Sequence, residues 1–183
     1  MKLPLFPKPY ADLVARLRVT CGFVLVAAFA WFSHPDARSL AGGLPVALLG
    51  LGLRGWAAGH LAKNQALATA GPYAYIRNPL YLGTMLVAAG LAIAARSLGL
   101  GGLFFVVFLC IYLPVMQLEE QHLRSLFPEY AAYAERVPAL VPRMAGVRSA
   151  KPFQWSLYAK NREYQAAVGF VAGALFLVWK ALR

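Results

Sequence analysis

The chain of 183 residues is both apolar and basic: 60% of its residues are hydrophobic, only 14% are charged, and its formal net charge is +11. This composition excludes a disordered chain, a collagen-like chain and an ordinary soluble domain, and the length suits a single domain over residues 1–183. Basic residues on an apolar chain usually set membrane orientation, so we expect membrane lipids and no nucleic acid as partners.

Five apolar stretches are long enough to be considered as membrane spans. They cover residues 13–32, 40–61, 80–95, 98–118 and 165–182. Only Arg96 and Ser97 separate the third stretch from the fourth, which predicts a tight helical hairpin. We therefore expect an all-α, polytopic membrane helical bundle of about five transmembrane helices. The first stretch has an alternative interpretation as a signal peptide, because it has a basic start and the pattern Ala28-Phe29-Ala30, but the long proline-containing lead argues against cleavage.

The distribution of Lys and Arg predicts the orientation of the bundle. Thirteen of the 18 basic residues lie in the N-terminal segment and in the connections 62–79 and 119–164, which fall on one side of the membrane. The positive-inside rule makes that side cytoplasmic. We therefore expect a protein of the plasma or inner membrane with its N-terminus inside and its active site facing the cytoplasm.

Two features are interpreted as structural. The dinucleotide-binding fingerprint is matched by residues 50–55 (GLGLRG), but these lie in an expected span and not between a strand and a helix, so we expect them to serve helix packing. The two cysteines lie in apolar runs and the three histidines are scattered, so no metal site is expected.

The most informative stretch covers residues 71–83 (GPYAYIRNPLYLG). Gly71 with Pro72 predicts a turn, and Asn78 is pushed out of helical geometry because a proline follows it. Pro79 suits the first turn of the third helix, whose free N–H groups and dipole favour an anionic group. The surrounding aromatic faces suit a cation or an adenine ring, or else form an interfacial belt, and they belong to Tyr73, Tyr75 and Tyr81.

Charged residues near the span ends leave two interpretations open. Arg54 lies within the second span, where an arginine is either functional or snorkels to the interface. Glu119 and Glu120 end the fourth span. They either face inward, to bind a cation or take a proton, or pair locally, Glu120 with Arg124 one turn later. Apolar residues at helical spacing then predict an interfacial helix interrupted near Pro128.

In this order, the motifs resemble those of integral-membrane methyltransferases, the group that contains isoprenylcysteine carboxyl methyltransferases and phospholipid N-methyltransferases. The resemblance covers about residues 54–143 as a catalytic core and leaves the span at 165–182 as an additional element. The residues that carry it are Gly71-Pro72-Tyr73, Arg77-Asn78-Pro79-Leu80-Tyr81-Leu82-Gly83, Glu119-Glu120, Leu123, Tyr130, Tyr133 and Val137-Pro138.

The resemblance implies S-adenosylmethionine as methyl donor, bound on the cytoplasmic side, and a lipophilic acceptor with either an isoprenylcysteine-type carboxylate or a phospholipid amine. It implies catalytic roles for Arg77, Glu119 and Glu120, and acceptor contacts for Arg54 and Arg124. Lys63 and Gln65 are further donor-binding candidates. The donor contacts that it implies directly are those of Gly71, Tyr73, Asn78, Pro79, Tyr81, Gly83, Glu119 and Glu120.

Two departures from the family pattern bear on the chemistry. Many members have His where this chain has Asn78, and Asn hydrogen-bonds without carrying a proton near neutral pH. The prenylcysteine enzymes tend to place an Arg one turn before the Glu pair, whereas residues 112–118 are uncharged here. A carboxylate acceptor would then need Arg54, Arg124 or Arg143. The rival hypothesis is a non-enzymatic membrane scaffold or lipid-binding subunit.

Overall fold

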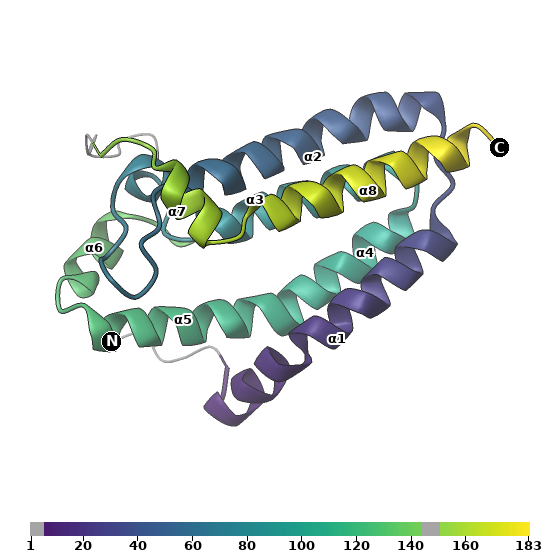
Figure 1. The fold of residues 1–183 in the computed structure, drawn as a ribbon. Helices are drawn as coiled ribbons and strands as arrows, with labels where there is room; N and C mark the ends of the chain where they lie inside the picture. The colour runs from purple at the N-terminus through teal and green to yellow at the C-terminus, as the bar shows by residue number, and fades with distance from the viewer. Residues whose placement is uncertain (1–5, 144–150) are drawn as a thin grey trace.

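The computed structural model describes residues 6–143 and 151–183, and within these ranges the chain is helical and contains no strand (Figure 1). This confirms the all-α class predicted above. It does not test the predicted number of spans or their arrangement. The elements, in chain order, are α1 (Lys8–Phe32), α2 (Ala37–Ala58), the 3₁₀ turn η1 (Gly71–Ala74), α3 (Pro79–Ala94), α4 (Leu98–Val107), the π-helical turn η2 (Phe108–Tyr112), α5 (Leu113–Leu126), α6 (Tyr130–Arg136), α7 (Trp155–Lys160) and α8 (Tyr164–Ala181).

The long helices form two groups. Figure 1 shows α2, α3 and α8 running side by side, and α1 lying along the continuous rod made by α4, η2 and α5. The two groups approach each other near the C-terminus, where Ala94, Ala95, Leu100 and Leu177 form a buried cluster. The short elements η1, α6 and α7 gather with their connections at the opposite end. That opposite end therefore holds most of the polar motifs.

The closest packing joins α2 to α3 through glycines. A Cβ atom at Gly50 would lie 2.6 Å from the carbonyl oxygen of Gly83, and one at Gly90 would lie 2.6 Å from that of Gly43. Neither position leaves room for a side chain, so the two backbones touch. Gly50 therefore serves helix packing, as predicted for the glycine-rich stretch, whereas Gly52 faces open space.

Within the described residues, three helices are long and apolar enough to cross a membrane: Ala37–Ala58, Leu98–Leu126 and Tyr164–Ala181. A fourth candidate is α1, if its two parts, which bend by 53°, count as one span. The helix in the third predicted stretch, α3, has only 16 residues and falls below this length. By length and composition the described residues thus provide three or four candidate spans, fewer than the five expected.

Two helices extend beyond the apolar stretches from which spans were predicted. The helix that contains the fourth stretch continues past the Glu pair to Leu126, because Glu, Gln, Leu and Arg all favour helix. The second helix begins earlier than expected. Asp36 and Ser39 form a capping box at its start, with Ser39 N donating to the Asp36 carboxylate at 2.7 Å.

Two basic residues make polar contacts between elements at the end of the bundle opposite η1. Arg96 Nη1 lies 2.9 Å from Asp36 Oδ2, which ties the end of α3 to the start of α2. Lys180 Nζ on α8 donates to the carbonyl oxygen of Ala30 at 3.0 Å and contacts Ser33 Oγ at 3.2 Å. The outer faces of α1 and α8 remain apolar and exposed, as at Phe23 and Leu175, which suits contact with lipid.

Candidate functional site

The bend that precedes α3 has the geometry that its sequence predicts. Gly71 has φ +58°, and a Cβ there would lie 2.8 Å from the ring of His60, so only glycine fits. Gly71 and the next three residues form η1, and those three are buried. Asn78 has φ −120° and ψ 56°, outside helical geometry, and Pro79 is the first residue of α3.

A segment that follows α6 runs beside this bend and holds it by backbone hydrogen bonds. Arg77 N donates to the carbonyl oxygen of Pro138 at 2.9 Å, and Asn78 N donates to that of Ala139 at 3.2 Å. In the reverse direction, Arg143 N donates to the carbonyl oxygen of Tyr75 at 3.0 Å. The bend is thus fixed in position although it belongs to no regular element.

Glu120 joins the bend to α5. Its Oε1 accepts a hydrogen bond from Asn78 Nδ2 at 3.0 Å, and its Oε2 lies 3.4 Å from Arg77 Nη1. Both partners of the ion pair are largely buried, with side-chain exposures of 14% for Arg77 and 18% for Glu120. Glu120 therefore pairs across the fold and not with Arg124, whose guanidinium lies over the ring of Tyr130 at 5.4 Å.

One donor atom in this cluster is left over. The Nε atom of Arg77 is buried and has no hydrogen-bond partner within the described ranges. A buried N–H without an acceptor is costly, and such atoms commonly mark a place where a ligand oxygen or a water binds. The residues at this point can therefore accept an anionic group, as the carboxylate of an amino acid would supply.

Three tyrosines stabilise the same region. Tyr133 Oη donates to the carbonyl oxygen of Tyr73 at 2.7 Å, which ties α6 to η1. Burial, reinforced by the nearby Glu120 carboxylate, raises the pKa of Tyr130 to about 12. Burial also raises the pKa values of Tyr73 and Tyr133 well above the ordinary range for tyrosine. All three hydroxyls thus stay protonated near neutral pH and act as hydrogen-bonding groups only.

The other residues that the resemblance implies for donor binding have different surroundings in the structure. Tyr81 packs edge-on against Tyr112 with 6.2 Å between ring centroids. Glu119 has an exposed side chain, and within the described ranges its carboxylate has no hydrogen bond or ion pair. Lys63 and Gln65 are exposed in the connection before η1, and no side-chain bond joins them to the cluster in the part of the chain described. Their roles stay predictions.

Two further residues have clear packing or pairing partners. A Cβ at Gly83 would lie 2.8 Å from the carbonyl oxygen of Gly50, so Gly83 is required for contact with α2 whatever else it touches. Arg54 forms a two-point ion pair with Glu163, with Nη2 to Oε2 at 3.1 Å. An acceptor anion could bind Arg54 only by competing with Glu163. The predicted contact of Arg54 with the acceptor therefore requires that the ion pair be weakened or broken. A role for Glu163 was not predicted from the sequence. The available signal was an acidic residue just before the last apolar stretch, which could pair with the arginine inside the second apolar stretch.

Two cavities flank the bend. The larger, of about 350 Å³, is an open depression over α6 and the segment after it, lined by residues 134–138 and 141–143. The smaller, of about 80 Å³, lies between the connection before η1 and the start of the C-terminal segment, and His60 and Lys151 are among its lining residues. Within the described ranges there is no group of three or more His, Cys, Asp or Glu that could hold a metal ion.

Comparisons with known proteins find one protein family and two named relatives to which this chain is similar. A model of the phospholipid methyltransferase family matches residues 46–130, which include the bend and both glutamates. The chain is 33% identical over 134 residues to the cobalt-zinc-cadmium resistance protein CzcN of Cupriavidus metallidurans, a match that covers 70% of this chain and 62% of that one. It is 30% identical over 161 residues to the nickel-cobalt-cadmium resistance protein NccN of Alcaligenes xylosoxydans xylosoxydans, covering 84% and 76%. No solved structure matches.

Proposed function

Because this chain belongs to the phospholipid methyltransferase family, we propose that it is an integral-membrane enzyme that moves a methyl group from S-adenosylmethionine to a lipophilic acceptor at the cytoplasmic membrane face. The observation that carries the proposal is the contact of Asn78 with Glu120. It joins the two motifs that the family resemblance requires to act together, although 42 positions separate them in sequence.

The donor site is proposed to form around this contact. The unpartnered Nε of Arg77 suits the carboxylate of the donor. The first turn of α3 offers less than its sequence predicts, because the N–H groups of Tyr81 and Leu82 already donate to the carbonyl oxygen of Asn78. Aromatic faces at Tyr73 and Tyr81 suit the sulfonium or the adenine ring. Further contacts are assigned, as the resemblance implies, to Gly71, Asn78, Pro79, Gly83, Glu119 and Glu120, and at the edge to Lys63 and Gln65.

Methyl transfer requires positioning, exclusion of water and an acceptor lone pair. When bound, the donor supplies a methyl group on a positively charged sulfur; the acceptor forms a bond to that carbon while the carbon–sulfur bond breaks and its electron pair stays on sulfur. Glu120 is occupied by Arg77 and Asn78 and serves to hold the site. Glu119 has a free, exposed carboxylate and is proposed to take the proton that an amine acceptor must lose.

A phospholipid amine fits this arrangement better than a carboxylate. A carboxylate acceptor needs a free arginine. Arg54 is engaged by Glu163 and Arg124 lies against Tyr130, which leaves the exposed Arg143 of the three arginines named above. An amine needs instead a base, which Glu119 supplies. We propose that the acceptor enters from the bilayer and that α1, α2, α3, the α4–α5 rod and α8 form five spans, α3 and α4 as a hairpin and the N-terminus inside. The catalytic core is then residues 54–143.

The experiment that tests the function is a transfer assay. The protein purified in detergent is incubated with methyl-labelled S-adenosylmethionine and membrane lipid extract, and the lipid fraction is separated and counted. We expect label in amine-bearing lipids, and a strong loss of label with Glu119→Gln but not with Glu135→Gln, an exposed glutamate on α6. Wild-type protein that binds no donor and labels no lipid would instead support the non-enzymatic subunit.

A further inference from the structure

A buried ion pair connects the C-terminal part of the chain to α2 and α3. Arg54 on α2 donates from Nε to Oε1 of Glu163 and from Nη2 to Oε2 at 3.1 Å. Glu163 immediately precedes α8 and is only 7% exposed. It lies outside residues 46–130, the range that the family model matches. The pair therefore joins a residue inside the range that the family model matches to a residue outside it.

The same guanidinium holds the start of α3. Arg54 Nη1 donates to the carbonyl oxygen of Leu80 at 3.3 Å and to the hydroxyl of Thr84, which itself donates to the Leu80 carbonyl at 2.9 Å. With the two bonds to Glu163, four of the five N–H groups of the arginine are used. Its contacts on α3 bracket Tyr81 and Gly83, two of the residues assigned to the donor site.

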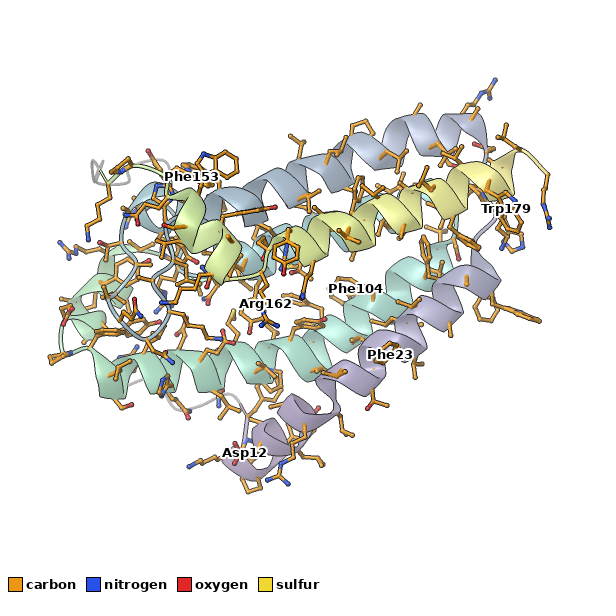
Figure 2. All side chains as sticks on the ribbon, in the orientation of Figure 1. Asp12, Phe23, Phe104, Phe153, Arg162 and Trp179 are labelled. Atoms are coloured by element: carbon orange, nitrogen blue, oxygen red, sulfur yellow. The ribbon has the colours of Figure 1, made fainter. Side chains whose placement is uncertain are left out.

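The position of Glu163 is itself fixed by the segment before it. Asn161 Nδ2 donates to the carbonyl oxygens of Ala58, the last residue of α2, at 2.9 Å and of Leu61, in the connection after it, at 2.8 Å. Gln154 N donates to the carbonyl oxygen of Gly59 at 3.0 Å. Figure 2 shows Phe153 at this same end of the molecule, beside α7. Residues 153–163 thus form a strap across the end of α2.

The pair lies close to η1 as well. The buried Tyr73 hydroxyl, whose pKa is raised first by burial, also senses the charges of Glu119, Glu163 and Arg54. A change in the pair would therefore alter the electrostatic environment of Tyr73.

We infer that Arg54 and Glu163 are positioning residues for the donor site: the strap places Glu163, Glu163 orients Arg54, and Arg54 fixes the first two turns of α3. This inference rests on the proposed function. It assigns the C-terminal segment a part in methyl transfer, through the orientation of Tyr81 and the bend, without contact with either substrate.

The test compares two ion pairs that both tie α2 to its surroundings. Glu163→Gln removes the charge next to the donor site, and Arg96→Gln breaks the pair with Asp36 at the opposite end of α2 and α3. Thr84→Ala is a milder second variant, which removes an Arg54 contact while leaving the ion pair. For each purified protein we would measure donor affinity by calorimetry and amide hydrogen exchange of peptides that cover residues 71–84.

The expected result is a loss of donor affinity of about tenfold or more for Glu163→Gln, a smaller loss for Thr84→Ala, and less than about twofold for Arg96→Gln. Exchange over residues 71–84 should accelerate in Glu163→Gln and not in Arg96→Gln. Unchanged affinity and unchanged exchange in Glu163→Gln and Thr84→Ala would overturn the inference. If the wild-type protein binds no donor, the proposed function fails and the link to a donor site fails with it, while exchange still records whether the pair fixes α3.

Discussion

The side-chain amide of Asn78 donates a hydrogen bond of 3.0 Å to the carboxylate of Glu120, and thereby joins the residue before α3 to the surface end of the α4–α5 rod. Arg77 reaches the other oxygen of the same carboxylate. One glutamate thus carries two partners from the same bend. Because all three side chains are partly buried, solvent screens these interactions less than it would at the surface, and they help to hold the bend in its conformation.

Substitutions of Asn78 should separate the effect of its hydrogen bond to Glu120 from the effect of a negative charge at this position. Asn78→Asp places a second carboxylate against Glu120 and should lower donor affinity and transfer rate by about tenfold or more, because two like charges at this distance repel. Asn78→His retains an N–H donor and should keep most of the activity. Calorimetry with the donor and the label-transfer assay measure both effects. Equal activity of the aspartate and histidine variants would show that the contact with Glu120 is dispensable.

Tyr133→Phe should lower the stability of the folded protein while leaving the rest of its structure largely unchanged. The variant removes the hydroxyl that donates to the carbonyl oxygen of Tyr73 and leaves that buried carbonyl without its partner. We expect a loss of about 1–3 kcal/mol in unfolding free energy, seen as a lower melting temperature in detergent. Tyr164→Phe, at an exposed position on α8, is the control. A melting temperature equal to that of the control would mean that α6 does not stabilise η1.

The raised pKa of Tyr130, about 12, makes a prediction at alkaline pH. An unfolded tyrosine ionises near pH 10, so the neutral folded form of Tyr130 stabilises the protein fully below about pH 10, and this contribution falls as the pH rises toward 12. The absorbance of phenolate, titrated in the wild type and in Tyr130→Phe, gives the curve of this residue by difference. A step in that difference near pH 10 would contradict its burial beside Glu120.

Glycines on α2 and α3 should differ sharply in their tolerance of alanine. A Cβ at Gly90 would lie 2.6 Å from the Gly43 carbonyl oxygen, whereas a Cβ at Gly52 meets nothing within 4 Å. Gly90→Ala should therefore destabilise by about 1–3 kcal/mol through overpacking, and Gly52→Ala should be neutral or stabilising because alanine favours helix. Thermal unfolding in detergent compares the two. Similar melting temperatures would argue against the close approach of α2 and α3.

The sequence allowed the bend and its neighbours to be predicted because their signals are local. Gly71 and the pair Asn78-Pro79 dictate backbone geometry within a few residues, and the break near Pro128 separates α5 from α6 as expected. The glycine-rich stretch was correctly interpreted as packing at Gly50, since its position in an apolar helix excludes the strand that a nucleotide site needs.

The relationships that the sequence did not reveal are those between distant residues. Arg54 could be recognised as an unusual charge, but its partner Glu163 is 109 positions away and no periodicity connects them. The bond between Tyr133 and Tyr73 is equally non-local. The predicted count of five spans was not confirmed. α3 has only 16 residues, as many as its apolar stretch, and the helix Leu98–Leu126 is longer than its apolar stretch, because caps and neighbouring residues decide where a helix ends.

Donor binding tests the central claim most directly, since the bend and Glu120 are held to form one site for S-adenosylmethionine. Calorimetry on the detergent-purified wild type should show saturable binding, and Tyr81→Ala and Glu120→Ala should each remove most of it. Glu129→Ala, an exposed glutamate beyond the end of α5, should bind as the wild type does. Wild-type affinity in both Tyr81→Ala and Glu120→Ala would contradict the account.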